Sequence, residues 1–412
     1  MLDSKPYKGV RDFYPDDWKK QQYMFDTQRA VLTRAGFEEF QASPLEHTEI
    51  YEKKGNEEII RDQTYTFTDR GDRRVTLRPE ITPTLARMVS EKRKTLTFPL
   101  RWFSIGNRFR YERMQRGRLR EFYQTDIDII GAPEGPADIE ILLTASKVLR
   151  AFGATPDHFT IRINSRTLLN TACTQVGLTS PEEIKNFFGL LDRKNKMTSD
   201  EWSESTKNIP NPLKAIEENT DPALRAEREK IETLIATVQS LGVTNISFDP
   251  TIVRGFDYYS GIVFEAVDTH KDNPRALLGG GRYDRLVELF TSDAIPCVGF
   301  AIGDVGFLNF LETHNLLPDT QQKQMLYLAT ASLSNTTKAL ELSEHLQAKG
   351  ICAWTNLLDK KVKDQIKDAL KRGASHFAVY GDDEEKSQKL TIKNLLTQES
   401  ATLSFASITS LE

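Results

Sequence analysis

Residues 98–131 read FPLRWFSIGNRFRYERMQRGRLREFYQTDIDIIG and contain two strand patterns joined by a basic loop. The arms, 98–111 and 121–131, are rich in aromatic and β-branched residues, which favour β-strands. Residues 108–120 carry six arginines and one carboxylate, Glu112. Guanidinium groups at this density repel one another unless a polyanion or solvent compensates them. The loop is therefore either a solvated hairpin tip or a binding site for phosphate groups.

The sequence around these strands predicts a mixed α+β domain. Apolar residues recur near helical spacing in 17–35, which ends at Gly36, and in 138–152. Residues 64–78 have two alternating arms around a polar turn, which predicts a hairpin. From about 165 to 240 the chain is rich in Lys, Glu and Asn with helical periodicity, and this pattern predicts a helical insertion.

Strand character returns at 245–268 and is followed by a predicted glycine-rich turn at 279–283 and a helix. The segment CVGFAIGDVGFLNFLE follows at 297–312. Residues 313–324 are polar and contain a proline, so they are predicted to be a linker. The first domain is therefore expected to span 1–320.

Residues 325–412 predict a separate small α/β domain. Its β-α-β-α-β order with one more strand favours a largely parallel sheet. The expected strands and helices lie at 325–330, 334–349, 351–356, 360–372, 376–381 and 389–397. The helix 360–372 carries six basic residues, and its apolar face is expected to hold Val362, Ile366, Ala369 and Leu370. The whole domain has eleven basic and eleven acidic residues, so it offers no broad positive surface for nucleic acid.

Composition restricts the kind of protein and its location. The chain has 412 residues, is 39% hydrophobic and 28% charged, and carries a formal net charge of −4, so any RNA contact must rest on local basic clusters. Its three cysteines are far apart, which argues against a disulfide framework and predicts a reducing compartment, the cytoplasm. The six histidines show no zinc-ligand spacing, so we expect no metal site made of protein side chains. The N-terminus lacks a signal-like apolar region, and no stretch is long enough to span a membrane.

Three further motifs combine groups suited to a charged ligand. Residues 253–265 (VRGFDYYSGIVFE) set Arg254 and Asp257 beside two tyrosines, and buried charges require partners; the alternative is an aromatic core strand. Residues 278–286 (LGGGRYDRL) allow close backbone approach to a ligand, or form an ordinary turn. They match neither GxGxxG nor GxxxxGK[ST], so a dinucleotide fold and a P-loop are unsupported. The glutamate of TLRPE (76–80) begins a probable helix, where it either complements the helix dipole or holds an ammonium group.

In their order and spacing these motifs resemble those of histidyl-tRNA synthetases, which are class II aminoacyl-tRNA synthetases. The resemblance rests on TLRPE, FR-x-E with its basic loop, EFYQTDIDIIG, RGFDYYSGIVFE and GGGRYD, and it runs from residue 9 to about 312. A looser resemblance to the family's anticodon-binding domain covers 325–412. It implies an antiparallel sheet flanked by helices, with the active site on one face, and homodimers formed through residues 30–50.

The resemblance also implies roles for individual residues. Arg110 matches the motif 2 arginine that holds the α-phosphate of ATP and the substrate carboxylate, and Glu112 matches the acidic residue beside the adenine. Arg254 matches an arginine specific to this family that stabilises charge on the α-phosphate. The positions that match histidine-binding residues are Glu80, Ile81 (usually Gly in the family), Thr82, Gln124, Asp128, Tyr258, Tyr259 and Tyr283. The candidates for tRNA contact in the basic loop are Arg113, Arg116 and Arg118.

The implied activity is that of a histidine–tRNA ligase. Such an enzyme activates L-histidine with ATP to histidyl-adenylate and pyrophosphate, then transfers histidine to the 3′-terminal adenosine of tRNA(His). The histidine carboxylate is the nucleophile, so positioning and electrostatics should supply most of the rate. Two arginines beside one phosphate, with Mg²⁺ on the outer phosphates, are the parts this reaction needs. Hydrogen bonds to both ring nitrogens would select histidine.

One position departs from the family pattern. Motif 3 of class II enzymes ends in an arginine that binds the γ-phosphate of ATP, and alignment puts Gly306 there. No Arg or Lys occurs in 297–312. Our hypothesis from the sequence is that Arg285, which follows GGGRYD at a position that is usually small, takes its place.

Two other functions stay open from the sequence alone. A regulatory paralogue that binds histidine and stimulates histidine biosynthesis would keep the fold, but such proteins lose parts of motif 2 and generally lack the anticodon domain. The missing motif 3 arginine is its best support. The third option is a non-catalytic tRNA sensor, which no kinase-like extension supports. Histidine-dependent exchange between ATP and pyrophosphate separates an enzyme from both.

Overall fold

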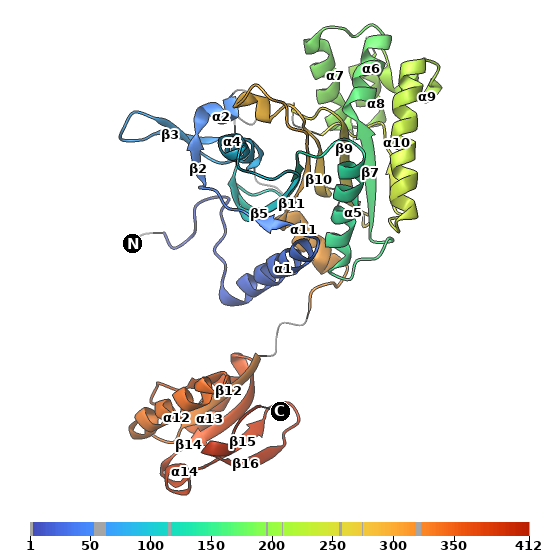
Figure 1. The fold of residues 1–412 in the computed structure, drawn as a ribbon. Coiled ribbons are helices and arrows are strands. Elements are labelled where there is room, and N and C mark those ends of the chain that lie inside the picture. The colour runs from blue at the N-terminus through green and yellow to red at the C-terminus, as the bar shows by residue number, and fades with distance from the viewer. Residues whose placement is uncertain are drawn as a thin grey trace. The chain divides into compact units, whose positions relative to one another are not determined.

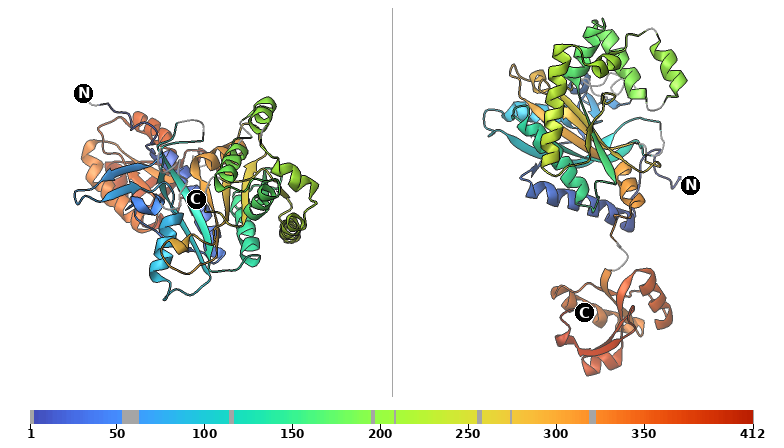
Figure 2. Two further views of the ribbon diagram at one scale, coloured as in Figure 1. Left: turned by 90° about the horizontal axis from the view of Figure 1, so that it is seen from above. Right: turned by 90° about the vertical axis from the view of Figure 1, so that its right-hand side faces the viewer.

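The computed structural model describes residues 3–52, 63–113, 117–194, 197–207, 209–254, 258–273, 275–318 and 323–411. Its contacts divide the chain into two compact units, Met1–Leu317 and Pro318–Glu412 (Figures 1 and 2). Each unit has a hydrophobic core of its own.

A large sheet forms the centre of the first unit. Its strand order is β1-β5-β6-β11-β10-β9-β7-β8, and its pairings are antiparallel except for β1 with β5 and β7 with β8 at the two edges. The strands are β1 (Glu38–Glu39), β5 (Leu100–Phe109), β6 (Glu121–Ile130), β7 (Phe159–Ser165), β8 (Ile246–Phe248), β9 (Ile262–Asp268), β10 (Ala276–Arg282) and β11 (Cys297–Gly303). The predicted antiparallel sheet is confirmed.

Strands β5 and β6 are the two strands predicted from 98–131, and both are confirmed. They pair along their full lengths, ten residues each. Because side chains alternate between the two faces of a strand, the odd-numbered residues Phe103, Ile127 and Ile129 all enter the main core. The even-numbered side chains of β6 are left to face the other side of the sheet.

Three helices cover the core face of this sheet. They are α1 (Pro15–Arg34), α5 (Pro136–Arg150) and α11 (Asp304–Thr313), and the first two confirm the helices predicted at 17–35 and 138–152. In Figure 1, α1 and α11 lie next to each other below the strands. Gln21 of α1 donates a hydrogen bond to the Asp304 carboxylate at the start of α11, at 2.9 Å.

Smaller elements pack on the opposite face. Helix α4 (Thr82–Lys92) sets Leu85 and Val89 against Leu100 and Ile130 of the central strands. A three-stranded sheet in the order β2-β4-β3 lies beside α4 and α2 (Thr48–Glu52). Its strands are β2 (Leu45–His47), β3 (Tyr65–Thr68) and β4 (Arg74–Leu77), and the last two confirm the predicted hairpin.

The predicted glycine-rich turn at 279–283 is wrong, because residues 279–282 belong to strand β10 in the middle of the sheet. A Cβ at Gly280 would lie 2.1 Å from the carbonyl oxygen of Gly299 on β11, so glycine is needed for close approach of two strands. The helix expected after this segment is only a single turn of 3-10 helix, η2 (Val287–Leu289).

The helical character predicted for 165–240 is confirmed. The helices are α6 (Arg166–Gln175), α7 (Pro181–Arg193), α8 (Ser199–Thr206), α9 (Pro212–Glu218) and α10 (Pro222–Ser240). They gather at the edge of the sheet formed by β7 and β8, as the green-to-yellow helices of Figures 1 and 2 show. The main hydrophobic core extends to these helices through Leu168, Ile216 and Ile231.

The second unit is a five-stranded sheet in the order β13-β12-β14-β15-β16. Its strands are β12 (Lys323–Thr330), β13 (Ala353–Thr355), β14 (Ala374–Tyr380), β15 (Lys389–Asn394) and β16 (Ser400–Ser404), and its helices are α12 (Thr336–Ala348), α13 (Val362–Lys371) and α14 (Asp382–Ser387). The first three strands in that order are parallel and the last two antiparallel. The small α/β domain is confirmed, but the segment 389–397 is not its last strand, since β16 follows.

One face of α13 differs from the prediction. Gln365 is buried and donates to the carbonyl oxygen of Thr330 at 2.8 Å, whereas Leu370 is 57% exposed. Successive residues of a helix are about 100° apart, so a stripe that runs through Val362, Ile366 and Ala369 turns Leu370 away from the sheet. The expectation that Leu370 belongs to the apolar face is wrong.

Within the part of the chain that the structure describes, no helix combines the length and the apolar character needed to cross a membrane.

We predict that Gly280→Ala destabilises the first unit. Its new methyl group would collide with the Gly299 carbonyl and the Phe300 backbone, and overpacking of this kind costs ~1–3 kcal/mol. Thermal unfolding should show a lower Tm. The matched control is Gly189→Ala on the exposed side of α7, where nothing lies within 4 Å of a new Cβ and a helical alanine should leave the Tm equal or higher. An unchanged Tm for Gly280→Ala would contradict the close approach of β10 and β11.

Candidate active site

A cavity of about 190 Å³ opens on the face of the large sheet that the three core helices leave free. Strands β6, β10 and β11, the turn before α4 and the segment before β9 contribute its walls. Its charged, hydroxyl and amide side chains are Glu80, Thr82, Arg110, Gln124, Asp126, Asp128, Arg254, Tyr258, Tyr259 and Tyr283. The fold thus brings together residues that lie up to 203 positions apart in the chain.

Strand alternation explains the floor of the cavity. Gln124, Asp126 and Asp128 of β6 share one face because they are two residues apart. Asp126 accepts a hydrogen bond from Gln124 at 2.8 Å and forms a buried ion pair of 2.6 Å with Arg108. Our reading of the sequence missed Asp126, although alternation with its two neighbours on β6 was a signal that could have found it.

Asp128 is a buried acid with one oxygen in use. Its Oδ1 accepts a hydrogen bond from the Tyr283 hydroxyl at 2.5 Å, and its Oδ2 has no partner among the described residues. Burial raises the pKa of Asp128 to about 8, against the opposing effect of the Tyr283 hydrogen bond. Gly299 lies opposite Asp128 in the β6–β11 register, where a Cβ would be only 2.0 Å from Oδ1. The carboxyl group therefore depends on a glycine to reach the cavity.

Glu80 is the second buried acid, on the loop before α4. Its Oε2 accepts a hydrogen bond from the Tyr258 hydroxyl at 3.0 Å. Burial raises the pKa of Glu80 to about 7, although the Arg110 charge acts to lower it. Arg78 fixes this loop to its surroundings by donating to the carbonyl oxygens of Asn107 and Ala42, at 3.0 and 2.8 Å.

The three tyrosines form an aromatic wall between the two acids. The ring centroids of Tyr258 and Tyr259 are 5.0 Å apart, and those of Tyr258 and Tyr283 are 5.7 Å apart with an edge-to-face angle of 68°. Two of their hydroxyl groups bind Glu80 and Asp128, so the wall is apolar in its faces and polar at its rim.

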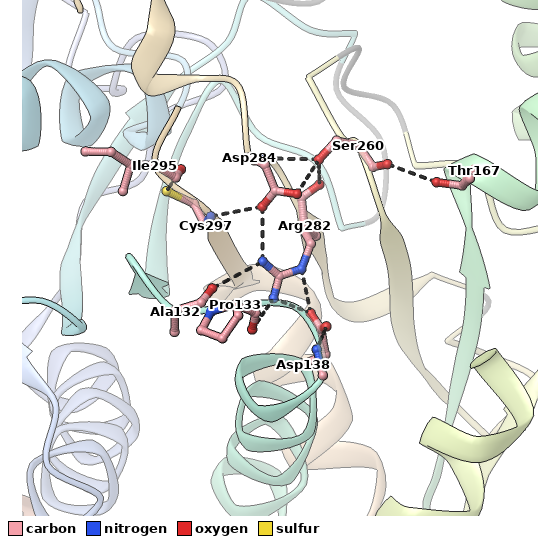
Figure 3. Close-up of polar contacts among 10 residues, drawn as sticks. Ala132, Pro133, Asp138, Thr167, Ser260, Arg282, Asp284, Ile295 and Cys297 are labelled. Atoms are coloured by element: carbon pink, nitrogen blue, oxygen red, sulfur yellow. Dashed lines mark hydrogen bonds and ion pairs between the residues drawn. The ribbon is translucent and has the colours of Figure 1, made fainter. Parts of the chain in front are cut away.

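A buried ion-pair network outside the cavity joins the two segments that carry these tyrosines (Figure 3). Arg282 contacts Asp138 of α5 at 2.8 Å and Asp284 at 3.0 Å. Asp284 in turn accepts a hydrogen bond from the Ser260 hydroxyl, and its backbone N–H donates to the same hydroxyl oxygen at 3.0 Å. Because Ser260 follows the tyrosine pair and Asp284 follows Tyr283, the network fixes both segments to the sheet.

Arg254 crosses the cavity from the segment before β9. Its backbone φ is +54°, a value that L-residues rarely adopt, and its Nη1 binds Glu265 of β9 at 2.6 Å. Burial opposes the charge, but Glu265 outweighs it and raises the pKa of Arg254, so the guanidinium stays charged. A Cβ at Gly279 would lie 2.3 Å from the guanidinium carbon, which means that the glycines of β10 make room for this side chain.

Arg110 lies at the end of β5 and lines the same cavity. Its Nε donates to the carbonyl oxygen of Pro79 at 2.9 Å, and its Nη1 is 4.0 Å from Glu112. Burial lowers the pKa of Arg110, and Glu112 partly offsets this effect. The cavity therefore joins two guanidinium groups from distant segments with two buried acids.

Comparison with known proteins shows the family of the whole chain. The family described as histidyl-tRNA synthetase matches residues 9–304, and the family described as anticodon binding domain matches residues 326–411. A protein named histidine–tRNA ligase from Leptospira biflexa is 37% identical over 420 residues, which cover 98% of this chain and 96% of that protein. The chain belongs to the histidyl-tRNA synthetase family.

Solved structures agree on the fold. The apo histidyl-tRNA synthetase of S. aureus has a TM-score of 0.77 and 27% identity, with 99% of both chains covered. A Bacillus halodurans structure described as an ATP phosphoribosyltransferase regulatory subunit/histidyl-tRNA synthetase has a TM-score of 0.73 at 21% identity, over 89% of this chain and 97% of that chain. At that identity the second likeness shows the fold alone.

Some positions matched to the family lie outside the cavity. Ile81 is fully buried beside it and exposes no side chain to it. Glu112 and Arg113 line a neighbouring pocket with Lys8, Tyr111 and Arg120. Arg116 and Asp257 fall outside the described residues.

Arg285 does not reach the cavity either. Its side chain is 73% exposed and pairs with Glu288 at 3.0 Å, away from the lining residues. The hypothesis that Arg285 replaces the motif 3 arginine is therefore unsupported, because its side chain is exposed and lies outside the cavity.

We predict that Asp128→Asn raises stability, and that its effect grows with pH. The pKa of Asp128 is 3.8 in the unfolded chain and about 8 in the folded chain, so between these pH values only the folded chain keeps the proton. Wild-type stability should then fall as pH rises from about 4 to about 8, and asparagine removes this dependence.

Thermal melts of the ligand-free protein at about pH 5 and about pH 8 test this, and we expect the Tm gained by Asp128→Asn to be roughly a few degrees larger at the higher pH. Asp16→Asn on exposed α1 is the control, with a side chain 90% exposed. A Tm difference that is the same at both pH values would show that Asp128 is ionised in the free protein.

Proposed function

We propose that this protein is a histidine–tRNA ligase, which activates L-histidine with ATP and transfers it to the 3′-terminal adenosine of tRNA(His). The observation that carries the proposal is the shared cavity of Arg110 and Arg254, with Glu80, Asp128 and the tyrosine wall in the same place. The family membership and the anticodon-binding unit agree with it. A protein that only bound histidine would not need two guanidinium groups for a phosphate.

The first reaction needs charge stabilisation more than a protein nucleophile. The histidine carboxylate attacks the α-phosphorus of ATP, the bond to the β-phosphate oxygen breaks, and pyrophosphate leaves. Negative charge on the α-phosphoryl oxygens grows during this displacement. Arg110 and Arg254 are proposed to hold those oxygens, since both are fixed before the ligand arrives, by Pro79 and by Glu265 respectively.

The acids and tyrosines are proposed to bind histidine. Glu80, together with Thr82, would accept hydrogen bonds from the α-ammonium group, and the free Oδ2 of Asp128 would accept one from an imidazole N–H. Gln124 lies beside them on β6. An apolar amino acid of similar size would leave these buried groups without partners, which strongly disfavours its binding.

Two regions are proposed to contact tRNA(His). Arg113 lies in the pocket with Lys8, Tyr111 and Arg120, and the Arg120 guanidinium is 3.8 Å from the centre of the exposed Tyr111 ring. Positive charge beside an exposed ring suits unpaired nucleotides. In the second unit, α13 and its flanking residues carry six basic side chains over 360–372, and this unit is proposed to read the anticodon.

Mg²⁺ is proposed as the cofactor. The described residues contain no group of three or more His, Cys, Asp or Glu side chains arranged for a metal. Mg²⁺ commonly binds through substrate phosphates, water and one or two carboxylates, so the ATP phosphates would be its main ligands here. When bound it would neutralise charge on the departing pyrophosphate.

We also propose a homodimer formed through residues 30–50, and a cytoplasmic location. Strand β1 within that segment is an edge strand of the large sheet, and an open edge can pair with a second chain. Cys173 and Cys297 are buried free thiols, which suits a reducing compartment.

We predict that histidine-dependent exchange between ATP and pyrophosphate occurs with the purified protein, and that Arg110→Ala and Arg254→Ala each reduce kcat by roughly 10²-fold or more. The matched control is Arg225→Ala on exposed α10, which should exchange like the wild type. Circular dichroism checks that all variants fold. Histidine binding without any exchange by the wild type would favour a regulatory protein instead of a ligase.

We predict further that histidine affinity falls as pH drops below about 7, because Glu80 must lose a proton before it can accept bonds from an ammonium group. Calorimetric titration across this range measures it. Glu80→Gln should weaken binding by roughly 10-fold or more above pH 7 and flatten the pH dependence. Glu91→Gln, on the exposed side of helix α4 that follows Glu80, is the control. If Glu80→Gln bound histidine as well as Glu91→Gln, the ammonium site would lie elsewhere.

A further inference from the structure

The turn that leads into β10 carries an arginine beside the cavity, Arg275. A Cβ at Gly117 would lie 3.2 Å from Arg275 Cδ, so the Arg275 side chain rests on the basic loop between β5 and β6. The next residues in the chain, Ala276 and Leu277, line the cavity itself. Arg275 therefore sits where the cavity meets the basic loop.

Positive charge exceeds negative charge at this place. Glu112 binds Arg118 at 3.1 Å and lies 4.0 Å from Arg110. Burial lowers the pKa of Arg275, Arg118 lowers it further, and Glu112 opposes both. Within the described ranges, no carboxylate is within ion-pair distance of Arg275. Among the described residues, Glu112 thus pairs with the guanidinium groups of Arg110 and Arg118 but not with that of Arg275, and the remaining positive charge favours an anionic ligand.

The residue after Arg275, Ala276, and the residue before α11, Gly303, line the same cavity. Strands β10 and β11 are antiparallel and pair Leu278 with Ile302. The first turn of α11 contains Gly306. A Cβ at Gly306 would meet nothing within 4 Å. Space is therefore open at the position where the family pattern has an arginine.

The turn that holds Arg275 is anchored to the same helix. Asp268 at the end of β9 accepts a hydrogen bond from Asn273 Nδ2 and contacts His314 Nε2, both at 2.8 Å. Asn273 Nδ2 also donates to Thr313 Oγ1 of α11 at 3.0 Å. Because Asp268 and Asn273 are buried, these bonds hold the turn in one place. An arginine on a fixed turn loses less conformational entropy when it binds a ligand.

We propose that Arg275, together with Arg118, binds the β- and γ-phosphates of ATP and takes the part that a motif 3 arginine would have. This inference rests on the proposed ligase function. The outer phosphates carry most of the charge of ATP, and a guanidinium fork matches their oxygens. Arg110 and Arg254 then hold the α-phosphate, and Arg275 with Arg118 holds the group that leaves as pyrophosphate.

The first test measures binding of ATP and AMP by calorimetry to the full chain. AMP has no β- or γ-phosphate, so Arg275→Ala should weaken ATP binding roughly 10- to 100-fold and leave AMP binding unchanged. Arg275→Lys keeps the positive charge, so its affinity for ATP should lie between those of the wild type and Arg275→Ala. Arg285→Ala is the control, because that exposed arginine lies outside the cavity. An equal loss for ATP and AMP, or no loss for ATP, overturns the proposal.

The second test measures histidine-dependent ATP–pyrophosphate exchange by the same variants. Arg275→Ala should raise the KM for ATP about 10-fold or more and leave the KM for histidine unchanged. If the wild type and Arg285→Ala exchange but Arg275→Ala keeps a normal KM for ATP, the role of Arg275 is refuted while the ligase function stands. If the wild type binds ATP but does not exchange, the ligase function is refuted, and the ATP-against-AMP comparison still decides the role of Arg275.

Discussion

The cavity depends on glycines in strands β10 and β11, because any side chain at these positions would collide with the residues that line it. A Cβ at Gly279 would lie 2.3 Å from the Arg254 guanidinium carbon, one at Gly281 2.8 Å from the Tyr259 ring, and one at Gly299 2.0 Å from the Asp128 carboxylate. Glycine weakens a strand through its backbone entropy. Here β10 and β11 lie in the middle of the sheet, and hydrogen bonds to strands on both sides offset that weakness.

Burial, together with the nearest charged neighbours, sets the pKa of each ionisable group in the cavity. Glu80 and Asp128 have raised pKa values because the loss of water on burial outweighs the tyrosine hydrogen bonds and the nearby arginine charges that act to lower them. Arg254 stays charged because Glu265 outweighs the same loss of water. The carboxyl oxygens of these acids can still accept hydrogen bonds, and the guanidinium groups nearby are held in place. Such a site suits two ligands together, one with an ammonium group and one with phosphates. The Arg275 turn extends the positive side of this arrangement toward the basic loop.

Much of the fold, and many of the residues that line the cavity, could be predicted from the sequence. Periodicity in 17–35 and 138–152 and the aromatic strands of 98–131 predicted elements that the structure contains. The strand at Gly279–Gly281 was missed because three glycines favour a turn locally, whereas in the sheet each is required by a different close neighbour, namely Arg254, Gly299 and Tyr259. Leu370 failed because its burial depends on which stripe of α13 meets the sheet.

The sequence by itself determined the helices, most strands, the family and the residue types that can bind a nucleotide and an amino acid. These features arise from propensities and spacings within a few residues of the chain. Only the tertiary structure decided which charges meet. Tyr258 binds Glu80 across 178 positions, and Arg275 instead of Arg285 lies beside the basic loop. Such contacts depend on strand order and register, because electrostatic forces act through space and not along the chain.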